Sequence, residues 1–231
     1  MSSTSESHPH GTSDPYVAHH FNSWAQQRES ASLGMWLFIA QEVMFFGGLF
    51  CAYAVYRIIH PEAFAFASET GLNVWLGGFN TAVLLTSSFT MALGVYCAQT
   101  GRNRRLMYAI LATIALACVF LFVKLQWEYI PKFTEGAFPG ANWAPHGHYA
   151  PFAAYEGQAG LQMFFVLYFI MTGMHALHMI IGMGYMFWLL YRAGTRHFGP
   201  RRYMAVENFG LYWHFVDIVW VFLFPMFYLV T

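Results

Sequence analysis

Several side chains able to carry a charge or a proton lie inside long apolar runs of this sequence. They include one carboxyl group, two pairs that contain histidine, and a lysine–glutamate pair. Carboxyl and imidazole groups transfer protons and bind metal ions, and a lysine beside a glutamate can form an ion pair. The residues concerned are Glu42, Lys124, Glu128, His175, His178, His214 and Asp217.

Glu42 lies within the apolar run 36–46, which reads WLFIAQEVMFF. If this run is helical, the carboxyl group stands roughly 15 Å from the start of the helix, at about 1.5 Å per residue. An ionisable group so far along an apolar helix needs a partner or a purpose. Two interpretations stay open. The carboxyl group is hydrogen-bonded within a helix bundle, or it handles protons or contacts lipid.

His175 and His178 are three residues apart and therefore share one face of a helix. His214 and Asp217 have the same spacing, and Glu207 stands shortly before them. Since imidazole and carboxylate groups suit iron, zinc or manganese, a bound metal is one hypothesis. The histidines of membrane di-iron enzymes form dense clusters at the aqueous boundary, whereas these are few and spread in depth. We therefore favour histidines that hydrogen-bond between helices, with no metal site.

Lys124 and Glu128 stand four residues apart near the end of another apolar run. Residues with this spacing are neighbours on a helix surface, so a direct ion pair is possible near the membrane interface. A structural pair is the favoured interpretation, and a role in a proton path is the alternative.

The amino-acid composition indicates whether these side chains lie in a soluble or in a membrane protein. Of 231 residues, 58% are hydrophobic and only 10% are charged. Soluble domains are about 45–50% apolar and about 25% charged, so this sequence indicates a membrane protein. The formal net charge of +0 gives no overall field to attract nucleic acid. Cys51, Cys97 and Cys118 lack the paired spacing of a disulfide framework or a zinc site.

Five apolar segments are long enough to cross a bilayer core of about 30 Å, which needs roughly 20 helical residues. We predict an all-α integral membrane bundle of about five transmembrane helices, over residues 33–56, 74–98, 107–127, 161–191 and 209–230. Residues 31–231 form the transmembrane domain. Residues 1–30 are predicted to be a polar, disordered cytoplasmic tail with an interfacial lead-in. The connection 131–158 is long and rich in Pro, Gly, Trp and His.

Basic residues set the expected orientation of the chain. They gather in the second and fourth connections, whereas the first connection is acidic and the third is nearly neutral. Because short cytoplasmic loops carry an excess of Lys and Arg, we expect the N-terminus inside and the C-terminus outside. The arginines concerned are Arg28, Arg102, Arg104, Arg105, Arg192, Arg196, Arg201 and Arg202.

Five motifs in chain order resemble those of the subunit III family of haem-copper terminal oxidases. They are 41–46 (QEVMFF) with Ala52 and Tyr53, 80–88 (NTAVLLTSS), 124–129 (KLQWEY), 172–182 (TGMHALHMIIG), and Glu207 with 212–220 (YWHFVDIVW). The last two are the most specific, and the set covers about residues 30–230. Many family members have seven membrane helices, so this chain resembles the shorter five-helix form, which lacks the first two.

The resemblance implies a non-catalytic accessory subunit of a proton-pumping oxygen reductase in an aerobic respiratory chain. It implies a multi-pass protein of a bacterial inner membrane that packs on subunit I. Subunit II and a small subunit IV would be further partners, and a respiratory supercomplex is a further candidate. It also implies no redox cofactor in this chain, since haem and copper lie in subunits I and II. The family role is to support proton uptake and to prevent inactivation during turnover.

The same resemblance implies that bound phospholipid contacts Glu42 and Arg192, with Arg192 placed where a headgroup would lie. Arg201 and Arg202 stand where many relatives have histidines, so Arg202 is a further candidate for headgroup contact. Imidazole proton transfer is not possible there. Structural roles are expected for the other motif residues, which are Lys124, Glu128, His175, His178, Glu207, Trp213, His214 and Asp217.

Two alternative functions stay open. The first is an accessory subunit of a nitric oxide reductase, which resembles subunit III. The second is a membrane di-metal enzyme with Glu42, His175, His178 and His214 as ligands. The electron donor, cytochrome c or quinol, would be bound by residues of other chains.

Overall fold

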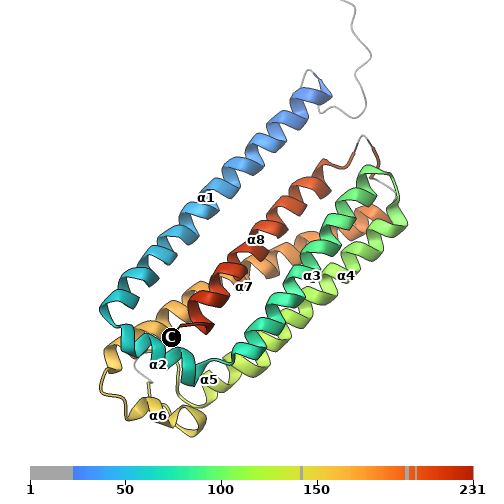
Figure 1. Cartoon of the computed structure of the whole chain (residues 1–231). Coiled ribbons are helices and arrows are strands. Elements are labelled where there is room, and N and C mark those ends of the chain that lie inside the picture. Colours follow the sequence, from blue (N-terminus) through green and yellow to red (C-terminus); the bar gives the residue numbers. More distant parts are fainter. Residues whose placement is uncertain (1–22, 141–142, 196–197, 201, 231) are drawn as a thin grey trace, which may run out of the picture.

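Five long helices dominate the computed structural model, which describes residues 23–140, 143–195, 198–200 and 202–230 (Figure 1). Each is long and apolar enough to cross a membrane. They are α1 (Trp24–Ile59), α3 (Val74–Gln99), the continuous helix Asn103–Thr134, α7 (Gln158–Gly194) and α8 (Met204–Tyr228). Over these described ranges there is no β-strand. The predicted all-α bundle with five transmembrane helices is confirmed.

The first helix begins earlier than the apolar run suggested. Ser23 caps α1, and its side chain accepts a hydrogen bond from the backbone N–H of Gln26 at 3.2 Å. Such a cap satisfies one of the N–H groups that a helix start leaves unpaired. The helix therefore includes residues from Trp24 onward that the sequence placed in the polar lead-in. The remainder of the predicted tail, residues 1–22, lies outside the described part.

The third transmembrane helix is also longer than predicted and has three parts. These are α4 (Asn103–Lys124), the π-helical turn η1 (Leu125–Tyr129) and α5 (Ile130–Thr134). The predicted end of this helix, Trp127, lies inside the π-helical turn. Single π-helical turns within α-helices frequently occur at functional sites. The predicted connection 131–158 accordingly begins in a helix and also contains the short helices η2 (Gly147–Tyr149) and α6 (Ala150–Ala153).

The helices form a bundle with α1 and α4 at opposite edges (Figure 1). Helices α3 and α4 pack together, α8 packs on α3, and α7 packs on both α4 and α8. Helix α1 packs on α7 and α8 and buries only three residues of its length, Glu42, Phe46 and Tyr53. Leu49, Phe50, Ala52 and Tyr56 are partly buried against the bundle, and most other residues of α1 are exposed.

Hydroxyl groups of α1 and of the following short helix bind the C-terminal end of α8. The Tyr53 hydroxyl donates to the carbonyl of Met226, and the Ser68 hydroxyl donates to the carbonyl of Phe227 at 2.7 Å. Ser68 belongs to α2 (Pro61–Gly71), a short helix at the same end of the bundle as α5 and α6 (Figure 1). The last carbonyls of a helix have no partner within it, so these bonds close the bundle at this end.

Candidate functional site

Glu42 on α1 and His178 on α7 form a polar contact inside the bundle. The Oε2 atom of Glu42 lies 3.1 Å from Nε2 of His178, and the two side chains are 11% and 12% exposed. The other ring nitrogen of His178, Nδ1, lies 2.8 Å from the carbonyl oxygen of Met174, one turn earlier on α7. The ring of Phe46 packs against the imidazole with centroids 5.4 Å apart. The contact thus joins the edge helix α1 to the bundle.

The geometry fixes how many protons this pair holds. A carbonyl oxygen is only an acceptor, so Nδ1 of His178 carries a proton and donates it to Met174. Nε2 and the Glu42 carboxyl group must then share one more proton to form their bond. That proton sits either on the carboxyl group, which donates to Nε2, or on the imidazole, which becomes a cation beside a carboxylate. One shared hydrogen bond of this kind therefore joins α1 to α7.

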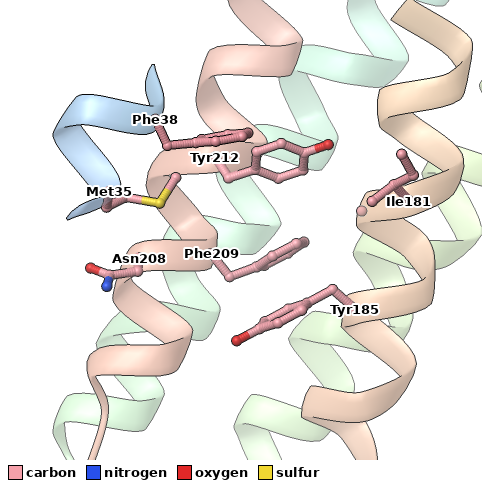
Figure 2. Close-up of a pocket in the computed structure, with 8 residues that line it drawn as sticks. Met35, Phe38, Ile181, Tyr185, Asn208, Phe209 and Tyr212 are labelled. Atoms are coloured by element: carbon pink, nitrogen blue, oxygen red, sulfur yellow. The ribbon is translucent and has the colours of Figure 1, made fainter. Parts of the chain in front are cut away.

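An apolar groove begins next to this pair and runs between α1, α7 and α8. Its volume is about 350 Å³. Figure 2 shows Met35 and Phe38 of α1 at one wall, with Tyr185 of α7 and Phe209 of α8 across from them. The rings of Tyr185 and Phe209 are stacked with centroids 5.2 Å apart. The remaining lining residues are Ile181, Gly182, Asn208 and Tyr212. Such a surface suits a hydrocarbon chain better than a polar ligand.

Tyr212 connects the groove with the pair of Glu42 and His178. Its ring lines the groove, and its hydroxyl donates to the backbone carbonyl of His178 at 2.8 Å. The ring of Phe38 lies 5.9 Å from that of Tyr212. A molecule in the groove would therefore contact the residues that hold His178 in place.

A second polar cluster lies around the π-helical turn. The Lys124 ammonium donates to Glu128 at 2.5 Å, to the Tyr228 hydroxyl at 2.7 Å and to the Tyr168 hydroxyl at 3.1 Å. Both tyrosines also donate to the same carboxylate oxygen of Glu128, Oε2. The ion pair that the spacing of Lys124 and Glu128 predicted is confirmed. Its tyrosine partners come from α7 and α8, so the cluster ties three helices together.

The predicted residues of α8 also have neighbours on α3. Nδ1 of His214 lies 2.6 Å from the Ser88 hydroxyl, and the buried Trp213 indole donates to the Ser87 hydroxyl at 3.0 Å. The Asp217 side chain is buried beside Ser88. Neither of its carboxylate oxygens has a hydrogen bond of ordinary geometry to the described residues. The contacts of His214 and Trp213 fit the expected bonding between helices, whereas Asp217 makes no such bond to the described residues.

His175 does not join His178, although both lie on α7. It is buried between the rings of Phe120 and Trp220, with centroids 5.6 Å and 5.4 Å away. Neither ring nitrogen has a hydrogen-bond partner in the described part of the chain. Of the four proposed metal ligands, only Glu42 and His178 meet. Among the described residues, no group of three or more His, Cys, Asp or Glu side chains is arranged to hold a metal ion.

Comparison with known proteins identifies the family. Residues 16–142 and 148–231 match the family described as Cytochrome c oxidase subunit III. The chain belongs to the cytochrome c oxidase subunit III family. It is therefore similar to proteins that are subunits of a membrane oxidase complex.

Individual members of the subunit III family show the same relationship. The chain is 30% identical over 218 residues to cytochrome c oxidase subunit 3 of Papio hamadryas, covering 92% of this chain and 73% of the relative. It is 33% identical to cytochrome c oxidase subunit 3 of Oncorhynchus clarkii, covering 84% and 67%. It is 29% identical to the probable quinol oxidase subunit 3 of Staphylococcus haemolyticus, covering 86% and 88%. The family thus includes relatives named for both electron donors.

Two of the three candidate lipid residues, Arg192 and Arg202, lie toward the C-terminal end of α7, away from Glu42. Arg192 is in the last turn of α7, and its guanidinium lies 5.0 Å from the ring of Trp188. Arg202 is exposed in the connection to α8, and Glu207 lies in the first turn of α8. Cations near a helix end and anions near a helix start are both favourable. Arg196 and Arg201 lie outside the described residues.

Sequence reasoning missed several members of the polar clusters. Lys132, Tyr168 and Tyr228 are buried against Glu128, and Tyr212 holds His178. Lys132 had a visible signal, because it stands four residues after Glu128 and continues the helix face of Lys124. The tyrosines had none, because they lie far away along the chain.

Proposed function

We propose that this chain is the accessory subunit III of a proton-pumping haem-copper oxygen reductase. In this role it packs on subunit I, alongside subunit II and a small subunit IV, and haem and copper belong to those partners. Membership of the subunit III family supports the assignment. The largely unburied α1 offers a surface for such a partner. The chain itself contributes bound lipid and a proton store beside the catalytic subunit.

The observation that carries the lipid part of the proposal is the groove between α1, α7 and α8. Arg192 lies fourteen residues after His178 on α7, which is roughly 21 Å along the helix at about 1.5 Å per residue. Half of a bilayer core of about 30 Å, plus a headgroup region, has a similar depth. A phospholipid with its phosphate at Arg192 would lay acyl chain along the groove and end near Glu42. An arginine is suited to this because its guanidinium donates two parallel hydrogen bonds to phosphate.

The proton part of the proposal depends on the pair of Glu42 and His178. The pair holds one shared proton at a depth where a lone charge would be costly. A lipid in the groove would contact Tyr212, which donates to the backbone carbonyl of His178. In this hypothesis the lipid keeps the pair in its bonded geometry. The pair and its ordered surroundings keep proton uptake by the oxidase in step with electron delivery.

We further propose that the end of the bundle that carries Arg28, Arg102, Arg104, Arg105 and Arg202 faces the cytoplasm of a bacterial inner membrane. The excess of basic residues on cytoplasmic loops supports this orientation. Labelling of single cysteines placed at Arg104 and at Glu156 in intact cells tests it. Glu156 lies in the connection at the opposite end and is exposed. Labelling of Glu156→Cys alone by an impermeant reagent is expected, and labelling of Arg104→Cys alone would reverse the orientation.

The functional proposal is tested in the purified oxidase complex with Glu42→Gln and Arg192→Gln. Both variants should keep the haem content of the partners. Arg192→Gln should lose phospholipid measured by mass spectrometry, and Glu42→Gln should slow proton uptake. Both should shorten the number of turnovers before inactivation. The control is Glu62→Gln, because Glu62 is exposed at the start of α2, away from the groove.

Normal lipid content, proton uptake and lifetime in both variants would refute the proposed roles of these residues. Co-purifying partners distinguish the remaining functions. If the chain co-purifies with subunits of a nitric oxide reductase, it is an accessory subunit of that enzyme and not of an oxygen reductase. Metal retained by this chain after its partners are removed would instead support the di-metal enzyme.

A further inference from the structure

A polar cavity lies at the end of the bundle formed by α2, α5 and η2. Its volume is about 580 Å³, and it opens beneath the connection between α2 and α3. Unlike the apolar groove, it is lined by several groups that can carry a charge. These are Glu69, Glu128, Lys132, Glu135 and His148. The cavity therefore needs an occupant that can form hydrogen bonds.

Two of the charged groups at this cavity are buried and incompletely bonded. Lys132 is 1% exposed, and its ammonium reaches one acceptor in the described chain, the backbone carbonyl of Glu128 at 3.4 Å. The ammonium also lies over the rings of Tyr149 and Tyr168, 5.6 Å and 5.2 Å from their centroids, and these rings attract its charge. An ammonium group has three N–H donors, so two of them still have no oxygen or nitrogen acceptor among the described residues. Glu128 is 2% exposed, and its Oε1 atom has no hydrogen-bond partner among the described residues, although Oε2 accepts three bonds.

The charged groups that line the cavity, together with its volume, indicate which kind of molecule can fill it. Burial of the donors of Lys132 and the acceptor of Glu128 without hydrogen-bond partners is unfavourable, the more so because both groups are charged. A hydrocarbon chain in the cavity would form no hydrogen bond with Lys132 or Glu128. An anion would be repelled by the three carboxylates at the cavity, and a cation by Lys132 and by Lys124 behind Glu128. Water satisfies donors and acceptors alike, and the cavity far exceeds the about 30 Å³ that one water occupies in the liquid.

We propose that this cavity holds ordered water, through which Glu128 and Lys132 exchange protons with the aqueous phase at that end of the bundle. The buried cluster of Lys124, Glu128 and Lys132 thereby becomes a second proton-accessible site. It is separate from the pair of Glu42 and His178, and it does not depend on the lipid proposal.

The groups around Glu128 suit proton exchange through water. Lys124 and Lys132 face it from its own helix, Tyr168 from α7 and Tyr228 from α8. On the cavity side stand Glu69, Glu135, His148 and Tyr149. Burial, with Glu135 and Glu128 nearby, raises the pKa of Tyr149 to about 12. Its hydroxyl group therefore stays protonated at neutral pH and can donate to cavity water. The Glu135 carboxylate accepts from the backbone N–H of His148 at 2.7 Å, which holds the rim of the cavity.

Access to the cavity is tested by cysteine labelling in the intact oxidase complex, with Cys51 and Cys118 replaced by alanine because both are exposed. Leu72 lines the cavity and is 7% exposed, so Leu72→Cys adds a thiol there without removing a charge. A small, charged, water-soluble thiol reagent should modify it completely. Ala137→Cys is the control, because Ala137 is fully buried at the same end but does not line the cavity. Equal protection of both cysteines would overturn the hydrated cavity.

Proton exchange is tested by infrared difference spectra of the complex at neutral pH, recorded before and after transfer from water to heavy water. A carboxylate signal that shifts when the ammonium and hydroxyl donors to Glu128 exchange their protons should be absent in Glu128→Gln and present in Glu62→Gln, whose carboxyl group lies away from the cavity, on α2. In the wild type this shift should appear at once. Spectra that are the same for the wild type and Glu128→Gln would overturn the exchange, even if Leu72→Cys is labelled. If Glu128→Gln fails to assemble, an immediate heavy-water shift in the wild type supports exchange and its absence contradicts it.

Discussion

The Oε2 atom of Glu42 lies 3.1 Å from Nε2 of His178, and this contact joins the edge helix α1 to the bundle. The two residues are 136 positions apart in the chain. Because Nδ1 of His178 already donates to a carbonyl, the two side chains share a single proton. One bond thus links α1 to α7, between residues that lie far apart along the chain.

We expect Glu42→Gln and His178→Gln to be coupled in their effect on stability. Hydrogen bonds between membrane helices contribute about 0.6 kcal/mol on average and up to about 1.7 kcal/mol, so a coupling energy of about 1 kcal/mol is expected. Thermal unfolding can be followed by modification of Cys97, which is buried in the native chain. Glu29→Gln is the control, because Glu29 is exposed on the first turns of α1 and should show no coupling to His178→Gln. Additive effects of Glu42→Gln and His178→Gln would contradict the bond.

Lys124→Met should be among the most destabilising single changes in this chain. It leaves the buried carboxylate of Glu128 without its nearest cation, and breaking a buried ion pair costs about 3–5 kcal/mol. The double variant Lys124→Met with Glu128→Leu should recover part of that loss, because the buried carboxylate is removed together with its nearest cation and only the Lys132 ammonium is left without that carboxylate. Retention of the subunit by the complex on heating in mild detergent measures both. Arg104→Met, at an exposed position, should have little effect. A double variant no better than Lys124→Met alone would argue against this explanation.

Gly77→Ala should weaken the packing of α3 on α8. A Cβ atom at Gly77 would lie 2.7 Å from the ring of Phe224 and 2.8 Å from the ring of Tyr228. Overpacking of this kind costs about 1–3 kcal/mol. The neighbouring Gly78→Ala is a matched control, since its Cβ would meet Phe224 at 3.9 Å, which is ordinary contact. Thermal unfolding of the two variants should separate them, and equal midpoints would show that the two helices adjust freely.

Ser87→Ala should destabilise the bundle by leaving the Trp213 indole without an acceptor. Both residues are fully buried, and the bond between them is 3.0 Å long. An unsatisfied buried donor costs about 1–3 kcal/mol. Thr86→Ala is the control, because the Thr86 hydroxyl is exposed and bonds only to the carbonyl of Ala82 on its own helix. Tryptophan fluorescence during thermal unfolding reports the difference, and equal losses for the two variants would count against the bond.

Residue order along the chain was enough to predict five membrane-spanning helices and an ion pair of Lys124 with Glu128. Apolar runs of this length are fixed by the need to satisfy every backbone group inside a bilayer, so they are visible without a structure. The ion pair follows from the geometry of a single helix, in which residues four apart are neighbours. The C-terminal end of the helix that carries Lys124 and Glu128 could not be predicted from the apolar run. The π-helical turn carries it past Trp127 to Thr134.

Only the tertiary structure decided which polar groups meet across helices. His175 and His178 share a face by spacing, yet His178 pairs with Glu42 while His175 lies between Phe120 and Trp220. The tyrosines around Glu128 and the open acceptor beside Lys132 were likewise invisible in the sequence. The physical reason is that helix rotation and crossing are set by the packing of whole faces. The spacing of residues along one helix fixes the side of the helix from which each side chain projects. Which side chain of another helix it meets on that side depends on how the other helices are placed.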